Sequence, residues 1–259
     1  MIGAFALTET DAGSDASALR TRAVKVHGGY RLTGAKQFIS SDRIAGFAIV
    51  FGVTDPDAGK RGISGFIVPT DSKGYAVDKV EHKLGQAASD TCAIRFDNVF
   101  VTEGLRLGAE GAGYSIALSN LEAGRIGISA QCVGMAQAAL EIAVDYAKNL
   151  KSFGKAIIEH QAVGFRLADL AAKLESARQL VLHAAAMKDA GLPCLTEASM
   201  AKLVASEIAE AVVSGAIQTL GGYGYLEEYG VAKIYRDVRV CQIYEGTSDI
   251  QRMVIARAL

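Results

Sequence analysis

The stretch Gly108-Ala109-Glu110-Gly111 divides the 259-residue sequence into two parts with different patterns. Before it, short β-type segments alternate with turn residues. Val24–His27 and Tyr30–Thr33 flank Gly28-Gly29, the pattern of a two-residue hairpin. Phe47–Phe51 is continuously apolar, as expected for a buried strand. Six or seven such strands with no helical pattern between them predict an antiparallel sandwich or barrel.

After this stretch, apolar residues recur every three or four positions along three long, alanine-rich segments. Stripes of this kind bury against one another in an antiparallel bundle. Breaks are predicted at Gly154, at Gly191-Leu192-Pro193 and at Gly221-Gly222, and a short final helix starts at Thr247. We therefore predict an α+β chain of two domains: a β-barrel or sandwich over residues 1–108, and an antiparallel four-helix bundle over residues 109–259.

The composition indicates a folded protein with little affinity for polyanions. Half of the residues are hydrophobic and 21% are charged, which is enough apolar material for a core. Lys plus Arg number 27 and Asp plus Glu number 28, with no block of like charge, so a nucleic-acid partner is not expected. Purely apolar runs are short and the first residues lack the pattern of a signal peptide, so we expect no membrane span and no leader.

Cysteine and histidine positions argue against a metal centre. The four cysteines are scattered, with no C-x-x-C pair, which favours a reducing compartment over a zinc site or a disulfide scaffold. The four histidines are far apart and form no H-E-x-x-H pattern. We therefore expect no metal.

Two segments of the first part contain polar groups suited to a planar or polar ligand. Residues 6–15 combine hydroxyls, carboxylates and a glycine at the end of a predicted strand, although an ordinary Asx or Ser turn is the simpler interpretation. In Lys36–Ser41, a strand would place Phe38 and Ser40 on one face, able to stack on and hydrogen-bond to a ring. Taken alone, a plain amphipathic strand explains this second segment better.

Two segments of the second part are equally open to more than one interpretation. Gln218–Tyr225 carries three glycines in four positions, which suit either a helix C-cap or close approach of a ligand to the backbone. In Val240–Arg252, Glu245 follows an apolar stretch and precedes a glycine and a helix start. A carboxylate in a partly apolar place has a raised pKa, as suits a general base, but a glutamate beside a helix N-terminus is also stabilised by the dipole.

Taken together and in this order, the four segments resemble the acyl-CoA dehydrogenase family of flavoproteins, and its short-chain and branched-chain members most closely. Tyr244–Ser248 and Leu220–Gly222 carry the resemblance, supported by residues 159–178, and it extends from about Phe5 to the C-terminus. The resemblance implies that the β-domain and the bundle hold FAD between them, and that the bundle forms a homodimer or homotetramer. Family members carry an N-terminal helical domain that this sequence lacks.

The resemblance also implies a role for each matching residue. Glu245 would be the base that removes the α-proton of a short or branched acyl-CoA, while the β-hydrogen leaves as hydride to flavin N5 and trans-2-enoyl-CoA forms. Electron-transfer flavoprotein would accept the electrons, in a bacterial cytoplasm or a mitochondrial matrix. FAD contacts would come from Leu7, Thr8, Ser14, Phe38, Ile39, Ser40, Gln161, Gln218, Gly221, Gly222, Thr247 and Asp249, and acyl-CoA contacts from Ser14, Glu122, Arg125, Tyr244 and Gly246. Of these, Gln161, Gln218, Gly221 and Gly222 would meet the FAD of a neighbouring subunit.

One departure from the family pattern bears on the cofactor. Leu150 stands where the family usually has an arginine for the FAD pyrophosphate, and Lys151 follows it. Two alternative functions remain open: an oxidase-type relative that passes electrons to oxygen, and a non-catalytic remnant that only oligomerises or binds a ligand. The intact Tyr244-Glu245-Gly246-Thr247 argues against the second alternative.

Overall fold

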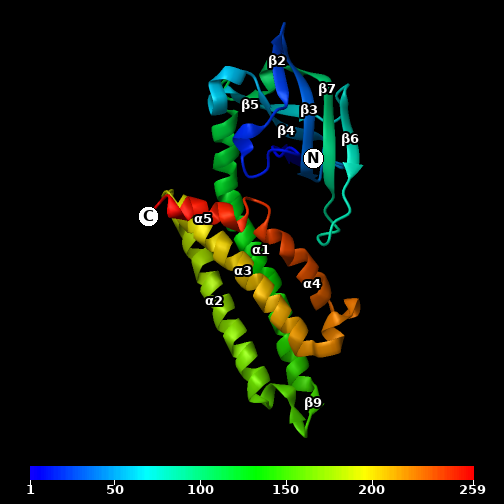
Figure 1. Cartoon of the computed structure of the whole chain (residues 1–259), viewed down its shortest axis with the longest axis vertical. Coiled ribbons are helices and arrows are strands. Elements are labelled where there is room, and N and C mark those ends of the chain that lie inside the picture. Colours follow the sequence, from blue (N-terminus) through cyan, green and yellow to red (C-terminus); the bar gives the residue numbers. More distant parts are fainter. The chain divides into compact units, whose positions relative to one another are not determined.

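The change of pattern near Gly108 coincides with a change of secondary structure. In the computed structural model, which describes residues 1–259, residues 3–107 form eight strands and long helices follow (Figure 1). The chain divides into two units, Met1–Asn120 and Leu121–Leu259. This division falls inside helix α1 (Gly113–Asn149), because its first residues group with the strands: Gly113 lies against the backbone of Ser64 and Gly65. The predicted α+β class is confirmed.

The first unit is an eight-stranded sheet in the order β6-β7-β3-β2-β4-β5-β8, with β1 paired to β4. The predicted hairpin is present with its turn shifted by one residue: Val26 of β2 pairs with Gly29 of β3, so the two turn residues are His27 and Gly28, and Gly29 belongs to the strand. Figure 1 shows β3 and β7, the two longest strands, side by side. The strands are β1 Gly3–Ala6, β2 Arg22–Val26, β3 Gly29–Ser40, β4 Phe47–Val53, β5 Ile63–Pro69, β6 Tyr75–Val80, β7 Thr91–Thr102 and β8 Arg106–Leu107.

The sheet is mixed, which corrects the expectation of a purely antiparallel one. β1 runs parallel to β4, with Gly3 opposite Phe47, and β2 meets β4 in parallel at Arg22 and Val53. A parallel pair needs a long crossover, and here residues 7–46, which include the β2–β3 hairpin, supply it. The continuous apolar run in β4 follows from its central position, with neighbours on both edges.

The second unit is built on three long helices joined by short connections. They are α1 (Gly113–Asn149), α2 (Gln161–Asp189) and α3 (Leu195–Leu220), and Figure 1 shows α2 and α3 running side by side. The predicted breaks are confirmed, because Gly154, Gly191 and Gly221 each have a positive φ. Two short helices complete the bundle: the predicted α5 (Ser248–Ala256) and α4 (Val231–Val238), which the sequence pattern did not separate.

Small residues allow the long helices of this unit to pack closely. The core combines alanines of α1 and α3 with leucines of α2, for example Ala136, Ala205 and Leu170. Helix α1 is long and apolar enough to cross a membrane by length and composition, which the short apolar runs had not suggested. Its apolar residues Ala136, Ala139 and Ala143 are fully buried in this core.

Candidate active site

Glu245 lies in a tight turn between two helical segments. The 3₁₀ turn Arg239–Gln242 leads into Tyr244, and both Glu245 (φ 55°) and Gly246 (φ 87°) are left-handed. Thr247 then caps α5, its hydroxyl accepting a hydrogen bond from the Ile250 amide at 3.3 Å. A left-handed glutamate is a strained conformation that persists only where surrounding contacts impose it, and such residues concentrate at functional sites.

The Glu245 carboxylate is turned onto helix α1. Its Oε2 is buried without a hydrogen-bond partner and packs against Gly124, where an added Cβ would come within 3.1 Å of the carboxylate carbon. Burial raises the pKa of this carboxyl, and the nearby cations Arg125 and Lys202 act in the opposite direction. The group is therefore a desolvated carboxylate with one oxygen free to take a proton.

Unpartnered buried polar atoms gather around this turn. Five such side-chain atoms exist in the chain, and four of them are Arg125 Nε, Glu245 Oε2, Ser248 Oγ and Gln251 Oε1. Buried polar groups in folded proteins are nearly always paired, so a cluster of exceptions marks a place where a ligand or water completes the pairing. The structure thus points to this turn as a binding site independently of the sequence motif.

Arg125 and Glu122, the two residues of α1 that were predicted to contact the acyl-CoA, lie in different environments. Arg125 is buried, faces Glu245 and donates from Nη1 to the Ser199 hydroxyl at 3.3 Å. Glu122 instead pairs with Lys188 at 3.0 Å, near the connection between α2 and α3. Arg125 is therefore part of the Glu245 environment, whereas Glu122 is engaged elsewhere within the helical unit.

Two side chains that sequence reasoning missed hold the backbone of the turn. Lys202 of α3 donates from Nζ to the Gly246 carbonyl at 2.7 Å. Gln251 of α5 donates from Nε2 to the same carbonyl at 2.8 Å and to the Glu245 carbonyl at 3.1 Å. Tyr244 is fixed separately, its hydroxyl donating to Gln131 Oε1 at 2.7 Å.

In the first unit, the segment around Phe38 and the loop after β1 lie together. The backbone N–H of Gln37 donates to the Thr8 carbonyl at 2.9 Å, next to a break in the β3–β7 register between Lys36 and Ile39. Phe38 takes a left-handed φ of 60° and leaves 63% of its surface exposed. Ser40 is also exposed, whereas the side chain of Ile39 is buried in the core and only its backbone can meet a ligand.

A buried ion pair anchors this loop. Lys36 is fully buried and donates to Glu9 Oε1 at 2.9 Å and to the Leu7 carbonyl at 3.1 Å. Glu9 also accepts from the amides of Arg20 and Thr21, at 2.6 and 3.0 Å. Burial lowers the pKa of Lys36 to about 8, against the opposing attraction of the Glu9 carboxylate. The pair fixes the Leu7–Thr8 segment beside Phe38, while Ser14 lies exposed further along the loop.

The remaining predicted residues form a separate group at the other end of the helical unit. Gln161, Gln218, Gly221 and Gly222 are exposed, and Tyr223 of the adjoining 3₁₀ turn contacts the Tyr146 ring, with centroids 6.2 Å apart. Residues 125 and 146 of α1 are about 30 Å apart along the helix. This group therefore lies far from Glu245. At the Glu245 end, Asp249 is exposed and pairs with Arg252 at 3.4 Å.

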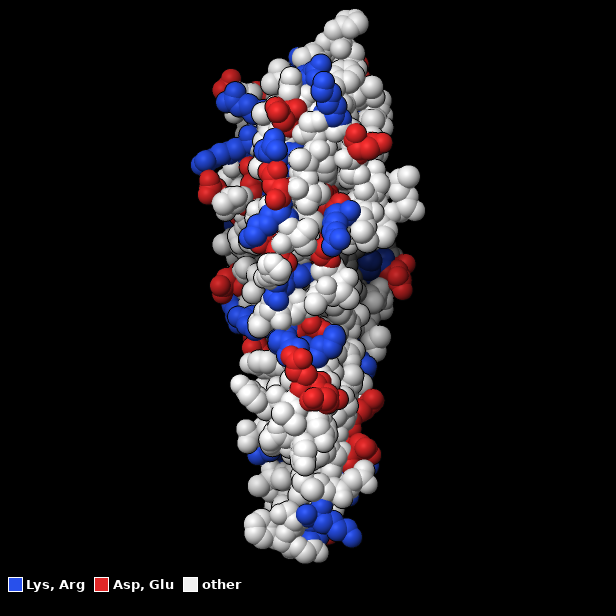
Figure 2. Space-filling model, turned by 90° about the vertical axis from the view of Figure 1, so that its right-hand side faces the viewer, with Lys and Arg blue, Asp and Glu red and all other residues white.

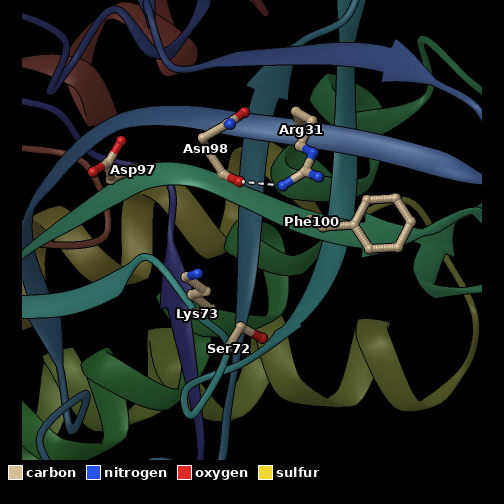
Figure 3. Close-up of a pocket in the computed structure, with 6 residues that line it drawn as sticks. All are labelled: Arg31, Ser72, Lys73, Asp97, Asn98 and Phe100. Atoms are coloured by element: carbon tan, nitrogen blue, oxygen red, sulfur yellow. Dashed lines mark hydrogen bonds between the residues drawn. The ribbon is translucent and has the colours of Figure 1, made fainter.

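A surface hollow of about 610 Å³ on the β unit does not coincide with these residues. It is lined by Arg31, Ser72, Lys73, Asp97, Asn98 and Phe100 (Figure 3). Arg31 there donates to the Asn98 carbonyl at 3.0 Å and lies over the Phe100 ring. None of the predicted site residues lines this hollow.

Each unit separately presents groups suited to a flavin and a thioester. The β unit offers the exposed ring of Phe38, the exposed Ser40 and the half-buried Thr8. The helical unit offers the unpartnered Glu245 carboxylate and open glycines at 221 and 222, where a Cβ would meet nothing within 4 Å. The chain contains no cluster of His, Cys, Asp and Glu side chains placed to hold a metal ion. The donor set fits an organic, ring-bearing cofactor.

Comparison with known proteins identifies the family. The family model described as "Acyl-CoA dehydrogenase, C-terminal domain" matches residues 111–259, and "Acyl-CoA dehydrogenase, middle domain" matches residues 4–99. The chain belongs to the acyl-CoA dehydrogenase family, as the resemblance predicted.

Individual relatives agree with this assignment. An acyl-CoA dehydrogenase of Bacillus subtilis is 50% identical over 100% of this chain and 68% of its own length. The caffeyl-CoA reductase–Etf complex subunit CarC of Acetobacterium woodii is 46% identical over 99% of this chain and 68% of its own. The solved butyryl-CoA dehydrogenase of Megasphaera elsdenii is 44% identical with a TM-score of 0.98, covering 99% of this chain and 67% of that one.

The family also settles the class of reaction and cofactor. Acyl-CoA dehydrogenases are FAD-dependent oxidoreductases, and solved complexes of the relative PigA, 35% identical to this chain, contain FAD. The predicted enzyme class and the predicted cofactor are both confirmed. The chain spans about two thirds of the length of these relatives.

Proposed function

We propose that the protein catalyses FAD-dependent α,β-dehydrogenation of a short or branched acyl-CoA, giving trans-2-enoyl-CoA, with Glu245 as the base. The observation that carries the proposal is the buried, unpartnered Oε2 of Glu245, flanked by Arg125 and Lys202. A general base works best when its pKa approaches the operating pH. Burial moves the carboxyl in that direction, and the two cations keep it ionised enough to accept a proton.

The side chains around Glu245 have distinct tasks in this proposal. Gly124 leaves room for the carboxylate against α1, and the left-handed turn at Glu245–Gly246 fixes where the carboxylate points. The Gly246 backbone and Tyr244 lie beside it, in positions to border the thioester. When bound, FAD supplies the acceptor for the β-hydrogen, which leaves as hydride when the α-proton is removed.

The β unit contributes the cofactor-facing groups in this proposal. Phe38 offers an exposed face for stacking, and the hydroxyls of Thr8 and Ser40 offer hydrogen bonds to ring heteroatoms. The buried Lys36–Glu9 pair holds the loop in register with this strand, so the contact surface is formed before the cofactor binds. Ser14 extends the surface toward the acyl-CoA, and Thr247 and Asp249 meet the FAD diphosphate end.

The names of relatives support the substrate class and the electron partner. The solved relative from Megasphaera elsdenii is a butyryl-CoA dehydrogenase, which favours a short acyl chain. The relative CarC belongs to an Etf complex, which favours an electron-transfer flavoprotein as the acceptor. Relatives include bacterial and mitochondrial proteins, and we accordingly place the enzyme in the bacterial cytoplasm or the mitochondrial matrix.

Self-association through the helical unit completes the proposal. Figure 2 shows a broad area with few charged side chains toward the end of this unit that carries strand β9 (Lys151–Ser152), whereas charges of both signs mingle elsewhere. Phe153, Phe165 and Tyr225 are 95%, 68% and 85% exposed. Exposed apolar area of this kind favours a homodimer or homotetramer, in which Gln161, Gln218, Gly221 and Gly222 meet the FAD of a neighbouring subunit.

Anaerobic bleaching of the flavin absorbance by butyryl-CoA or isobutyryl-CoA tests the proposal. Glu245→Gln keeps the shape of the side chain and removes the base, so bleaching should slow by about 10²–10⁴-fold at unchanged flavin content. Near-normal bleaching by this variant would refute the assignment of the base. Reoxidation of the bleached enzyme then distinguishes the electron acceptors: rapid reaction with oxygen identifies an oxidase, and slow reaction identifies a dehydrogenase.

A further inference from the structure

Lys202 is a fully buried lysine in the middle of an apolar helix face. It occupies α3 between Ala198 and Ala205, which are both buried, and its own side chain is 0% exposed. No carboxylate lies within ion-pair distance of its ammonium. A buried ammonium is costly unless hydrogen bonds compensate it, so its hydrogen bond to the Gly246 carbonyl, at 2.7 Å, is the contact to explain.

The Gly246 carbonyl receives two buried donors from different helices. Lys202 approaches from α3 and Gln251, also 0% exposed, approaches from α5 at 2.8 Å. Gln251 additionally holds the Glu245 carbonyl at 3.1 Å. The backbone they hold includes a strained residue, because Glu245 is left-handed without being a glycine, and Gly246 beside it is left-handed too. Strain of this kind persists when the surroundings over-determine the conformation, and these three hydrogen bonds do so.

We propose that Lys202 is a positioning residue for the base: with Gln251 it clamps the Gly246 carbonyl, fixes the left-handed turn, and supplies a positive charge facing the Glu245 carboxylate. The inference rests on the proposed role of Glu245. It gives Lys202 of α3 a task beyond packing in the core. Lys202 acts through Glu245 and the turn, without touching the substrate.

The charges around both groups define how the clamp responds to pH. The groups that face Lys202 are Arg125 and Cys132 from α1, Cys241 from the 3₁₀ turn, and Glu245. Those that face Glu245 are Arg125 and Lys202. Burial lowers the pKa of Lys202 to about 8, so it is charged at neutral pH and loses its charge just above. Loss of that charge removes one of the two cations that lower the pKa of Glu245.

Carbon-13 NMR of the Glu245 carboxyl in the full chain tests directly whether the charge of Lys202 acts on Glu245. The signal is assigned as the glutamate resonance that disappears in Glu245→Gln. In the parent protein we expect a second inflection of this signal near pH 8, where Lys202 deprotonates, and we expect Lys202→Met to remove it and to raise the Glu245 midpoint. Lys202→Arg keeps the charge and should hold the midpoint close to that of the parent. A parent titration with no second inflection, together with an unchanged Glu245 midpoint in Lys202→Met, would overturn the claim that Lys202 supplies this charge.

Hydrogen exchange of the segment 244–248 tests the clamp. Loss of a buried hydrogen bond from a charged group should speed exchange there by about tenfold or more in Lys202→Met. Gln251→Leu should speed exchange while leaving the inflection near pH 8 in place. Lys173→Met, which removes an exposed lysine of α2 paired with Asp169, is the matched control and should change neither readout.

These readouts separate the failure of the inference from the failure of the proposed function. Unchanged exchange and an unchanged Glu245 midpoint in Lys202→Met refute the clamp and leave Glu245 as the base. If flavin bleaching persists in Glu245→Gln, the role of the base fails whatever Lys202 does. Neither NMR nor hydrogen exchange depends on turnover.

Discussion

Replacing Gly124 with alanine should separate stability from catalysis. Gly124 lies in helix α1, where alanine is favoured over glycine by about 1 kcal/mol. The added Cβ, however, would lie 3.1 Å from the Glu245 carboxylate carbon and closer still to Oε2, inside van der Waals contact. The clashing atoms are the end of a flexible side chain, so the carboxylate moves aside at little cost in folding free energy.

Displacing the Glu245 carboxylate should slow the reaction, because removal of the α-proton depends on the position of the base. A misplacement of about 1 Å can lower the rate by on the order of 10²-fold, because the base no longer meets the α-proton at the right distance. We therefore expect Gly124→Ala to fold with unchanged or slightly higher stability, bind flavin normally, and bleach with butyryl-CoA about 10²-fold more slowly.

Gly127 supplies the matched control, one helical turn further along α1. A Cβ there would meet nothing within 4 Å, so Gly127→Ala should gain the same helix propensity and keep full activity. Thermal denaturation and anaerobic stopped-flow bleaching of the two variants form the assay. Equal bleaching rates in the two variants would refute the placement of the Glu245 carboxylate against Gly124.

Three further variants extend the test to stability and cofactor binding. Folding raises the pKa of Glu245, so the ionised side chain destabilises the fold as the pH rises above the ordinary pKa of a glutamate. In thermal melts, Glu245→Gln should therefore be more stable than the parent at pH 7, and this difference in stability should close toward pH 4. Lys36→Met leaves Glu9 buried without its cation and should destabilise the protein by about 3 kcal/mol in urea, whereas Lys25→Met at an exposed pair should change little. Leu150→Arg adds the guanidinium usual in the family and should tighten FAD about tenfold or more in a fluorescence titration, and an unchanged dissociation constant would count against a pyrophosphate contact there.

Periodicity predicted the elements because local burial determines them. The apolar run at Phe47–Phe51 became β4. The glycine breaks at 191 and 221 follow the ends of α2 and α3, and the break at 154 lies in the turn between the short strands β9 and β10 (Lys155–Ala156), which connect α1 to α2. The parallel pairing of β1 with β4 was not predictable in this way. It joins strands separated by residues 7–46, and pairing over that separation depends on the whole sheet rather than on either segment.

The sequence motif predicted Glu245, but it did not predict the side chains that hold Glu245 in place. Glu245 was chosen from its neighbours in sequence, and the structure supplies the burial and the unpartnered oxygen that the sequence could not show. Lys202 and Lys36 carried a readable signal, since each interrupts a periodic apolar face with a charge, Lys202 between Ala198 and Ala205. The sequence carried no signal for the contacts of Gln251 and Gly124, because these contacts depend on a turn whose left-handed backbone only the fold reveals.

The central claim, that Glu245 removes the α-proton, is tested most directly by proton exchange without oxidation. A 3-thia acyl-CoA has sulfur at the β-position and cannot lose a β-hydride, so only removal of the α-proton is observed. With flavin-loaded protein in deuterium oxide, we expect the parent to incorporate deuterium at the α-carbon and Glu245→Gln to incorporate it about 10²–10⁴-fold more slowly. Equal incorporation by the two proteins at equal flavin content would contradict it.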